Sequence, residues 1–397
     1  MSVIITNAKN RIAYNVVRSL GEKGINVYTA DFVRSSMSFA SRYSKGHFIY
    51  PSPFRYQEEF IECIIENIRR LKAKVIIPVY EETFLMAKHK DRLSKYVKIV
   101  IPDYDQILIA HNKDRWGVIA ERLQIPVPKS YTIEALKKKV VDRKTLRYPV
   151  LIKPKQGGGG WAITQVSSPD ELERILDQEA NNGLEWERFF IQEKIEGEIH
   201  CVAMLFCKGE YRAKVTYKQI RDYPVAGGQA TLRVSLSNEA AERHLKRMLE
   251  YLQWHGICQA DFIVDKNSGT PYLIDINPRL WGSLAQGIAS GVDFPYLLYK
   301  IAIDGDVKPL NEFKTGVVTR WIGGDIRAFL SLLKTSEKKL EVFRKFFFLN
   351  KGAAYYDDFC LNDPLPFFTW TLDILYRTIK YRSISPNMHD SLEGVWE

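Results

Sequence analysis

Two short runs of β-branched and aromatic residues on either side of a polar turn constrain the fold of this chain more than any other feature. The runs occupy residues 262–264 and 272–276, and the turn-forming sequence Lys-Asn-Ser-Gly-Thr occupies 266–270 between them. This pattern predicts a β-hairpin. If the hairpin is centred on Ser268, residues at equal distances from Ser268 lie opposite each other on the two strands.

The predicted hairpin places three oxygen-bearing side chains on one face. Asp261 and Asp275 lie opposite each other, and Asn277, two residues further along, points to the same face. Two carboxylates at this separation repel each other unless a cation lies between them. Hard oxygen ligands of this kind suit Mg²⁺, or Mn²⁺, particularly when phosphate oxygens and water complete the coordination shell. The alternative is a pair of solvated strand acids beside a turn asparagine.

Length and composition indicate a globular protein with more than one domain. The chain has 397 residues, of which 46% are hydrophobic and 26% are charged, and this length is enough for two or three domains. We expect no signal peptide and no transmembrane span, because no long uninterrupted apolar window is present. The five cysteines are scattered without a CxxC pair, which indicates reduced thiols and a cytoplasmic location.

The formal net charge of +10 is compatible with a nucleic acid, an anionic membrane surface or an anionic substrate as partner. Lys and Arg are spread along the chain rather than gathered in one basic block with interleaved aromatic residues. We therefore expect no binding to nucleic acid.

The first hundred residues alternate between strands and helices. We expect strands at residues 3–6, 25–29, 75–79 and 97–101, and amphipathic helices around 13–20 and at 58–71. This alternation predicts a parallel sheet in a Rossmann-like α/β unit. The loop after the first strand contains no glycine, so the GxGxxG fingerprint is absent and we exclude a dinucleotide site that uses Asp31.

Lys153 ends an apolar strand and is followed by a glycine run, which comprises Gly157, Gly158, Gly159 and Gly160. Residues without a Cβ atom allow backbone amides to close over phosphate oxygens, and a lysine at the end of a strand can reach the same space as a cation. The GxxxxGK[ST] pattern of a Walker A loop is absent. A plain turn is the alternative.

Two further features have functional interpretations. Residues 189–198 form a strand that runs into a glycine turn, and such a hinge offers an apolar slot with backbone donors and acceptors for an adenine ring. Arg279 follows the hairpin acids on the same face, where a guanidinium stabilises charge on a transferring phosphoryl group. The alternatives are a surface strand end for the first feature and a structural ion pair for the second.

Taken in order, these segments resemble the ATP-grasp superfamily over roughly residues 1–305. The resemblance rests on four motifs, NKDRW, YPVLIKP with its glycine run, IQEKIEG, and ADFIVD with YLIDINPR. It includes a preceding domain of the kind found in carbamoyl phosphate synthase large subunits and biotin carboxylases. The resemblance implies an α/β fold, with α+β architecture in the catalytic part.

The same resemblance implies a division of the chain. Residues 1–111 would form a Rossmann-like pre-ATP-grasp domain, and residues 112–305 the ATP-grasp domain, with a lid subdomain at about 120–192 and a metal-binding subdomain at about 193–305. Residues 306–397, rich in aromatic side chains, would form a C-terminal extension that packs on the catalytic domain or on a partner. An interfacial anchor on an anionic membrane is the alternative. A homodimer is plausible.

Carried over position by position, the resemblance assigns a role to each motif residue. Lys113 and Lys153 would contact the nucleotide phosphates beneath the glycine run, and Arg279 would stabilise an acyl phosphate. Glu198 would hold the ribose. The set that would hold adenine is Gln192, Glu193, Lys194 and Ile195, and the set that would bind one or two Mg²⁺ ions is Asp261, Asp275 and Asn277.

Recognition of the second substrate falls on a segment that we expect to be a loop. Residues 218–229 would cover the acceptor side of the cavity, where Arg221 would hold a substrate carboxylate through two hydrogen bonds. A surface arginine in a mobile loop is the alternative.

The resemblance implies an ATP- and Mg²⁺-dependent ligase that acts on a small-molecule carboxylate and an amine, or on a carboxylate and a thiol. ATP would convert the carboxylate to an acyl phosphate, the nucleophile would displace phosphate, and ADP would be released. Two alternatives stay open. One is phosphorylation of bicarbonate or carbamate, as in carbamoyl phosphate synthases, and the other is a nucleotide-binding module without turnover.

Overall fold

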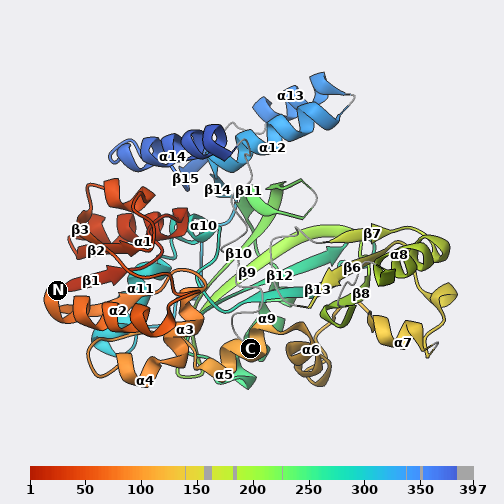
Figure 1. Cartoon of the computed structure of the whole chain (residues 1–397), viewed down its shortest axis with the longest axis horizontal. Helices are drawn as coiled ribbons and strands as arrows, with labels where there is room; N and C mark the ends of the chain where they lie inside the picture. The colour runs from red at the N-terminus through yellow and green to blue at the C-terminus, as the bar shows by residue number, and fades with distance from the viewer. Residues whose placement is uncertain are drawn as a thin grey trace.

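Three β-sheets surrounded by helices make up the molecule. The computed structural model describes residues 1–138, 140–155, 163–181, 186–225, 227–336, 338–348 and 352–381. The strands within these ranges form two four-stranded sheets and one seven-stranded sheet. Figure 1 shows the three sheets following one another along the horizontal long axis, with α12, α13 and α14 at the upper end of the view, to one side of that axis.

The first sheet is parallel and has the strand order β3-β2-β1-β4. This arrangement confirms the predicted Rossmann-like unit. The sequence SKGHFI of β3 contains too few apolar residues to predict a strand. The strands are β1 (Ser2–Ile5), β2 (Asn26–Asp31), β3 (Ser44–Ile49) and β4 (Ala73–Ile77), and the crossovers include α1 (Arg11–Glu22) and α2 (Gln57–Leu71).

Residues 97–101 do not form the expected strand, so this prediction is wrong. Lys98 makes a single parallel bridge to Val75, with backbone hydrogen bonds to both neighbours of Val75 in β4. The chain then leaves the sheet towards Pro102, which has no amide N–H with which to extend the ladder. Most of the apolar side chains in 97–101 are buried nonetheless. Their apolar character therefore reflects burial rather than strand pairing.

The second sheet has the strand order β13-β12-β9-β10-β11-β14-β15. The predicted hairpin, β12 and β13, forms one edge, and two strands from the C-terminal part of the chain extend the other edge. The strands are β9 (Gly197–Cys207), β10 (Glu210–Tyr223), β11 (Gln229–Ser235), β12 (Gly256–Asp265), β13 (Pro271–Asn277), β14 (Val318–Arg320) and β15 (Ala353–Tyr356).

The third sheet is antiparallel and has the strand order β5-β8-β6-β7. Its core, which includes Val150, Ile152 and Leu172, is a cluster of its own. The elements are β5 (Ser130–Thr132), β6 (Val150–Pro154), β7 (Thr164–Val166) and β8 (Phe189–Glu193), with the helices α7 (Ile133–Lys137) and α8 (Pro169–Asn181).

The other helices connect these sheets or pack against them. No helix in the described part of the chain is long and apolar enough to cross a membrane. The helices that connect the sheets or pack against them are α3 (Glu82–Lys88), α4 (Lys90–Leu93), α5 (Tyr104–His111), α6 (Lys113–Arg122), α9 (Glu239–Tyr251), α10 (Leu284–Ala289), α11 (Phe294–Asp304), α12 (Ile322–Thr335), α13 (Lys339–Phe348) and α14 (Leu365–Tyr381). Short 3-10 turns lie at Met37–Ala40, Arg143–Thr145 and Trp186–Arg188.

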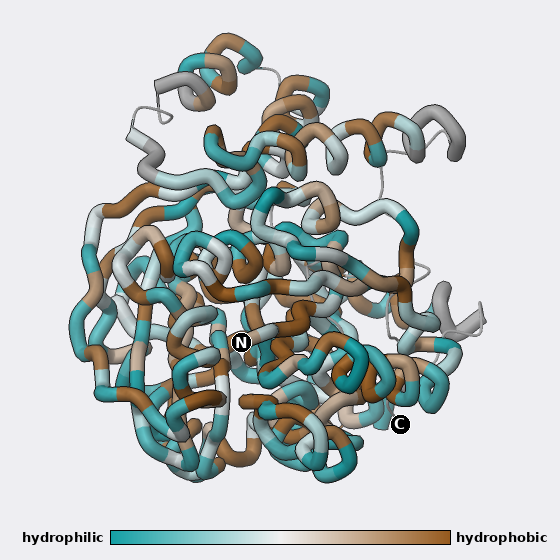
Figure 2. The backbone as a smooth tube through the Cα atoms, turned by 90° about the vertical axis from the view of Figure 1, so that its left-hand side faces the viewer, coloured by the Kyte–Doolittle hydropathy of each residue, from teal (hydrophilic) through white to brown (hydrophobic). Residues whose placement is uncertain are grey.

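One hydrophobic core joins the first sheet to the seven-stranded sheet. Val3 of β1 and Val16 of α1 belong to the same buried cluster as Ala203 of β9 and Phe294 of α11. Burial of this continuous apolar surface stabilises the two sheets as one body. In Figure 2, hydrophobic segments run through the interior, and hydrophobic bands also mark the helices at the upper end.

Candidate active site

The hairpin acids lie where the sequence predicts them. In the antiparallel pair of β12 and β13, Asp261 is directly opposite Asp275, and Gln259 is opposite Asn277. Gln259 donates a hydrogen bond of 2.6 Å from Nε2 to Asp261 Oδ1 and accepts one of 2.8 Å from Asn277 Nδ2. Since the Asn277 amide nitrogen is used in this way, its Oδ1 atom is the one suited to a cation. The predicted pairing of Asp261 with Asp275 is confirmed, whereas a β-bulge between Asp261 and Phe262 shifts the register of the turn-side pairs by one residue.

The two carboxylates make this face electrostatically unfavourable for protein atoms alone. Burial, the largest cause, and the negative charge of Asp275 together raise the pKa of Asp261 to about 6. The described residues contain no cluster of three or more His, Cys, Asp or Glu side chains that could hold a metal ion. Two carboxylates and one amide oxygen fit a Mg²⁺ ion that takes its other ligands from water or from a phosphate.

Two lysines approach the hairpin acids from different elements. Lys113, at the start of α6, places its Nζ atom 3.7 Å from Asp275 Oδ1. Asn112 caps α6 by accepting hydrogen bonds from two backbone amides, which fixes the start of the helix and therefore the position of Lys113. Lys153 lies on β6 in the neighbouring sheet and is only 8% exposed.

Lys153 is held in an apolar environment close to a second cation. Its Nζ atom donates a hydrogen bond of 2.8 Å to Gln192 Oε1, and Gln192 in turn donates one of 3.0 Å to Ser130 Oγ. Burial, the largest cause, and the charge of Lys113 together lower the pKa of Lys153 to about 8 against the opposing effect of Asp275. Lys113, Lys153 and the hairpin acids therefore form one electrostatically coupled group.

The residues expected to hold adenine and ribose occupy the end of β8 and the start of β9. The amides of Glu193 and Lys194 donate to backbone carbonyls of Lys129 and Pro149, so their N–H groups are already used. Ile195 is half-buried beside them. Glu198 lies on β9 rather than in the hinge turn, and it accepts a hydrogen bond of 2.9 Å from Lys218 Nζ, which lowers the pKa of the Glu198 carboxyl.

Residues 157–160, the glycine run, lie outside the residues that the structure describes. Their proposed contact with phosphates stays a prediction, as do the nucleotide roles of the hinge residues.

Arg279 has a partner that the sequence did not reveal. Its Nε and Nη2 atoms lie 3.0 and 2.9 Å from Glu81 Oε1, and its guanidinium lies 4.3 Å from the centre of the Tyr80 ring. Glu81 stands just after β4, so the first sheet positions an arginine that follows β13. The two residues are 198 positions apart, and no local pattern in the sequence indicates their contact.

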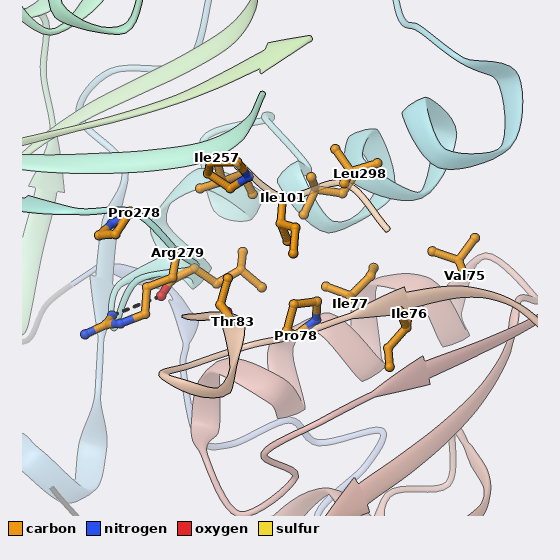
Figure 3. A pocket seen from close by; sticks show the side chains of 13 residues that line it. Val75, Ile76, Ile77, Pro78, Thr83, Ile101, Ile257, Pro278, Arg279 and Leu298 are labelled. Atoms are coloured by element: carbon orange, nitrogen blue, oxygen red, sulfur yellow. Dashed lines mark hydrogen bonds between the residues drawn. The ribbon is translucent and has the colours of Figure 1, made fainter. Parts of the chain in front are cut away.

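A small apolar cavity lies behind Arg279. Its volume of about 20 Å³ is sufficient for about one water molecule. Figure 3 shows Ile77, Ile257 and Leu298 around this space, with the Arg279 guanidinium directed away from them. The cavity therefore marks the packing between the first sheet and β12 rather than a ligand pocket.

Arg221 does not lie in the expected loop. Residues up to Tyr223 continue β10, so the loop predicted for 218–229 is limited to the connection between β10 and β11. Arg221 donates from Nε and Nη2 to Asp325, at 2.8 and 2.7 Å, and Arg320 donates to the same carboxylate at 2.6 Å. Asp325, at the start of α12, is fully buried. In this structure the bidentate partner of Arg221 is thus a protein carboxylate.

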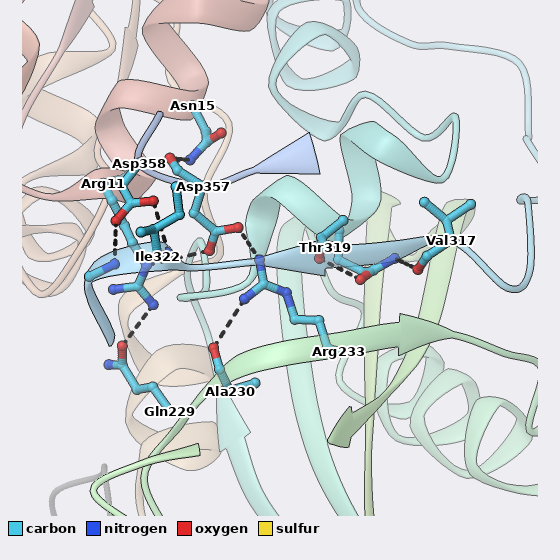
Figure 4. A network of polar contacts seen from close by, with 12 residues as sticks. Arg11, Asn15, Gln229, Ala230, Arg233, Val317, Thr319, Ile322, Asp357 and Asp358 are labelled. Atoms are coloured by element: carbon cyan, nitrogen blue, oxygen red, sulfur yellow. Dashed lines mark hydrogen bonds and ion pairs between the residues drawn. The ribbon is translucent and has the colours of Figure 1, made fainter. Parts of the chain in front are cut away.

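A second polar network ties the C-terminal segment to α1 and to the seven-stranded sheet (Figure 4). Arg11, in the first turn of α1, donates 2.9 Å to Gln229 Oε1 and stacks 3.8 Å from the ring centre of Trp321. Asp357 forms an ion pair with the fully buried Arg233, and its other oxygen lies 3.5 Å from Arg11 Nε. Sequence reasoning missed this network, because its members lie hundreds of positions apart.

Comparison with known proteins identifies the class to which this site belongs. Residues 112–283 match the family model described as ATP-grasp domain. The carbamoyl phosphate synthase large chain of Thermotoga neapolitana is 25% identical in a match that covers 55% of this chain and 20% of that protein. The urea amidolyase of Lachancea kluyveri is 25% identical in a match that covers 64% of this chain and 15% of that protein. The chain thus spans about a fifth or less of the length of these two curated relatives.

Solved structures agree on the fold. The biotin carboxylase domain of Hydrogenobacter thermophilus 2-oxoglutarate carboxylase, in complex with MgADP, ADP and bicarbonate, has a TM-score of 0.62 at 18% identity and covers 80% of this chain and 73% of its own. The L-amino acid ligase of Bacillus licheniformis has a TM-score of 0.57 at 15% identity and covers 78% and 77%. Residues 112–283 therefore match an ATP-grasp domain, as the sequence motifs in this range predict, and the solved structures share the fold of the chain.

Proposed function

We propose that this chain is an ATP- and Mg²⁺-dependent ligase that joins a small-molecule carboxylate to an amine through an acyl phosphate. The observation that carries this proposal is the convergence of Lys113 and Lys153 on Asp261 and Asp275. Paired acids and paired lysines on facing elements suit a nucleotide triphosphate, whose negative oxygens need cations and whose bound metal needs carboxylates.

The hairpin residues Asp261, Asp275 and Asn277 would hold Mg²⁺. When bound, this ion offsets negative charge on the phosphate oxygens during phosphoryl transfer. The Asn112 cap fixes the start of α6 and therefore the backbone of Lys113. The Lys113 ammonium could then contact a phosphate without any rearrangement of α6. Lys153 is held by Gln192, and its burial makes its charge act through a medium of low polarity.

Arg279 would stabilise the acyl phosphate, with Glu81 as its positioning residue. The Glu81 carboxylate contacts Nε and Nη2 of the guanidinium. Nη1 donates 3.2 Å to the carbonyl of Leu280. The ring of Tyr80 supports the guanidinium from one side. These contacts restrict the arginine to one orientation before a substrate arrives, which reduces the entropic cost of forming the transition state.

The proposed reaction has two balanced steps. A carboxylate oxygen of the acid attacks the terminal phosphorus of ATP, the phosphorus–oxygen bond to ADP breaks, and an acyl phosphate forms. The amine nitrogen then attacks the acyl carbon, phosphate leaves with the bonding electrons, and the nitrogen loses its proton. A thiol acceptor would give a thioester by the same sequence.

Bicarbonate or carbamate is the second candidate for the phosphorylated acid. The curated carbamoyl phosphate synthase relatives and the bicarbonate-bound biotin carboxylase neighbour favour it. The L-amino acid ligase neighbour favours an organic acid and an amine. A nucleotide-binding module without turnover is the third candidate, and the retained lysines, acids and Arg279 argue against it.

Measurement of ADP release tests the proposal. The full chain is incubated with Mg²⁺ and ATP, with pooled carboxylates crossed against pooled amines and thiols, and with bicarbonate alone. ADP that requires both an acid and a nucleophile supports the ligase, whereas ADP with bicarbonate alone supports the second candidate. No ADP under any condition, despite tight binding of MgATP, would contradict both enzymatic readings.

The Asp275→Ala variant links the activity to the hairpin. We expect it to lose turnover, as chelation of Mg²⁺ does, while circular dichroism shows an unchanged fold. Glu250→Ala is the matched control, because it removes an exposed carboxylate on α9 and should leave turnover unchanged. Full activity of Asp275→Ala would contradict the metal assignment.

A further inference from the structure

Exposed apolar side chains concentrate on the helices at one end of the molecule. Figure 1 shows α12, α13 and α14 together at this end, beyond β14 and β15. The active-site elements described above lie on the other side of those strands. A globular protein rarely leaves a contiguous apolar surface of this kind uncovered, because its exposure to water is unfavourable.

Helix α14 carries the clearest part of this surface. Leu365, Phe368, Leu372 and Leu375 are 62%, 55%, 64% and 55% exposed. Their spacing of three, four and three residues places them on one face of the helix. The opposite side packs on the protein, where the Trp370 ring would collide with any side chain added at Gly323. The helix is therefore apolar both where it meets the protein and where it meets solvent.

Helix α12, whose first turn meets α14 at Gly323 and Trp370, carries two more exposed apolar side chains. Ile326 and Leu330, one helical turn apart, are 45% and 51% exposed. We call the six residues of α12 and α14 the apolar end face. Figure 2 shows hydrophobic bands on the same upper helices.

The sequence next to the apolar end face is basic. Residues 334–345 contain five Lys or Arg and two Glu. Lys334, Lys338, Lys339 and Arg344 are exposed. The acids of the neighbouring core are not available to balance them, because Asp325 and Asp357 are buried and paired with arginines inside the protein.

We propose that the apolar end face and its basic margin bind the surface of an anionic lipid bilayer. Leucine and phenylalanine side chains enter the boundary between headgroups and acyl chains, while lysine and arginine attract anionic headgroups. A second copy of this chain is a poorer occupant, because a symmetric contact would bring the two basic margins together. The helices lie on the membrane rather than across it, in keeping with their length and composition.

Sedimentation with lipid vesicles tests this inference. The full chain is mixed with vesicles of phosphatidylcholine alone or of phosphatidylcholine with phosphatidylglycerol, at low and at high salt. We expect binding to the mixed vesicles, weakened by salt, and little binding to phosphatidylcholine alone. No binding to either vesicle overturns the proposal.

Two pairs of variants separate the contributions of apolar contact and charge. Leu372→Asp should weaken the partition to mixed vesicles by at least about tenfold, because a leucine no longer enters the bilayer. Val140→Asp is the control, because Val140 is 76% exposed but lies beyond α7, and this variant should leave the partition to mixed vesicles unchanged. Lys338→Glu should weaken the partition by about fivefold or more, whereas Lys95→Glu, at an exposed residue near α4, should not.

Circular dichroism and the midpoint of thermal unfolding show whether each variant is folded. Equal binding of folded Leu372→Asp and the unmodified chain overturns the proposal. A chain that ignores vesicles but forms a dimer that Leu372→Asp dissociates also overturns it, and assigns the apolar end face to a second copy. Loss of ligase activity alone does not bear on this surface, because the proposed function uses other residues.

Discussion

The buried amine of Lys153 gives the proposed nucleotide site a characteristic pH dependence. Its pKa falls from an ordinary value of 10.5 to about 8 because the side chain is removed from water, and Lys113 adds to the effect. The cation is therefore present below pH 8 and lost as the pH rises through 8, whereas an exposed lysine would keep it to much higher pH. If Lys153 contacts phosphate, affinity for MgATP should follow this titration.

The expected magnitude comes directly from the pKa. With a pKa of about 8, about nine-tenths of the molecules carry the Lys153 proton at pH 7 and about one-tenth carry it at pH 9. If only the protonated form binds, the Kd for MgATP should rise about tenfold over this interval. A smaller rise would mean that the neutral form binds weakly but measurably.

Isothermal titration calorimetry at pH 7, 8 and 9 measures this change on the full chain. Lys153→Arg is the control, because a guanidinium keeps its charge throughout this range. We expect a flat profile for this variant. A flat profile for the unmodified chain, or an equal fall in Lys153→Arg, would refute the assignment of Lys153 to the phosphates.

Three further predictions concern a lysine of the site, a buried ion pair and a glycine in the seven-stranded sheet. Lys113→Met should raise the pKa of Lys153 by removing a nearby cation, and the fall in MgATP affinity should then shift to higher pH in the same titrations. Arg233→Met should destabilise the protein by up to about 3–5 kcal/mol in urea unfolding, because the buried Asp357 carboxylate then keeps only Arg11, 3.5 Å away, as a cationic partner; replacement of both Arg233 and Asp357 should cost less. Gly197→Ala should lower the thermal midpoint by the equivalent of about 1–3 kcal/mol, because a Cβ atom there meets a β12 carbonyl oxygen at 2.0 Å, whereas Gly117→Ala, in open space on α6, should raise it slightly.

Local patterns were sufficient for most of the fold. Next to the turn the strands pair Phe262 with Leu273, and a register shift between Asp261 and Phe262 brings Asp261 opposite Asp275, so this pairing depends on a β-bulge as well as on the turn. The strand expected at 97–101 does not form. The apolar character of a segment cannot distinguish a hydrogen-bonded strand from a buried extended segment that makes only an isolated bridge. The C-terminal strands could not be predicted, because β14 and β15 depend on pairing with β11 and on buried ion pairs.

The site was predictable to the extent that its residues lie in motifs. Lys113 and the hairpin acids come together as expected. Glu81, Arg11 and Gln229 were missed, because each contact joins residues that are far apart in the sequence and of common types. Arg221 has the bidentate geometry that was expected, but its partner is a carboxylate of this chain.

The distribution of core residues has a mechanical consequence. Because one core binds the first sheet to the seven-stranded sheet while the four-stranded sheet that carries Lys153 has its own, the molecule should move as two rigid bodies rather than as three domains. The stretch from Ile125 to Pro128, which contains two prolines, is a short and conformationally restricted linker between these two bodies. Amide hydrogen exchange should then show one slow unit and one faster one. A movement of the four-stranded sheet away from the seven-stranded sheet would carry Lys153 away from the hairpin acids while Lys113 stays with them.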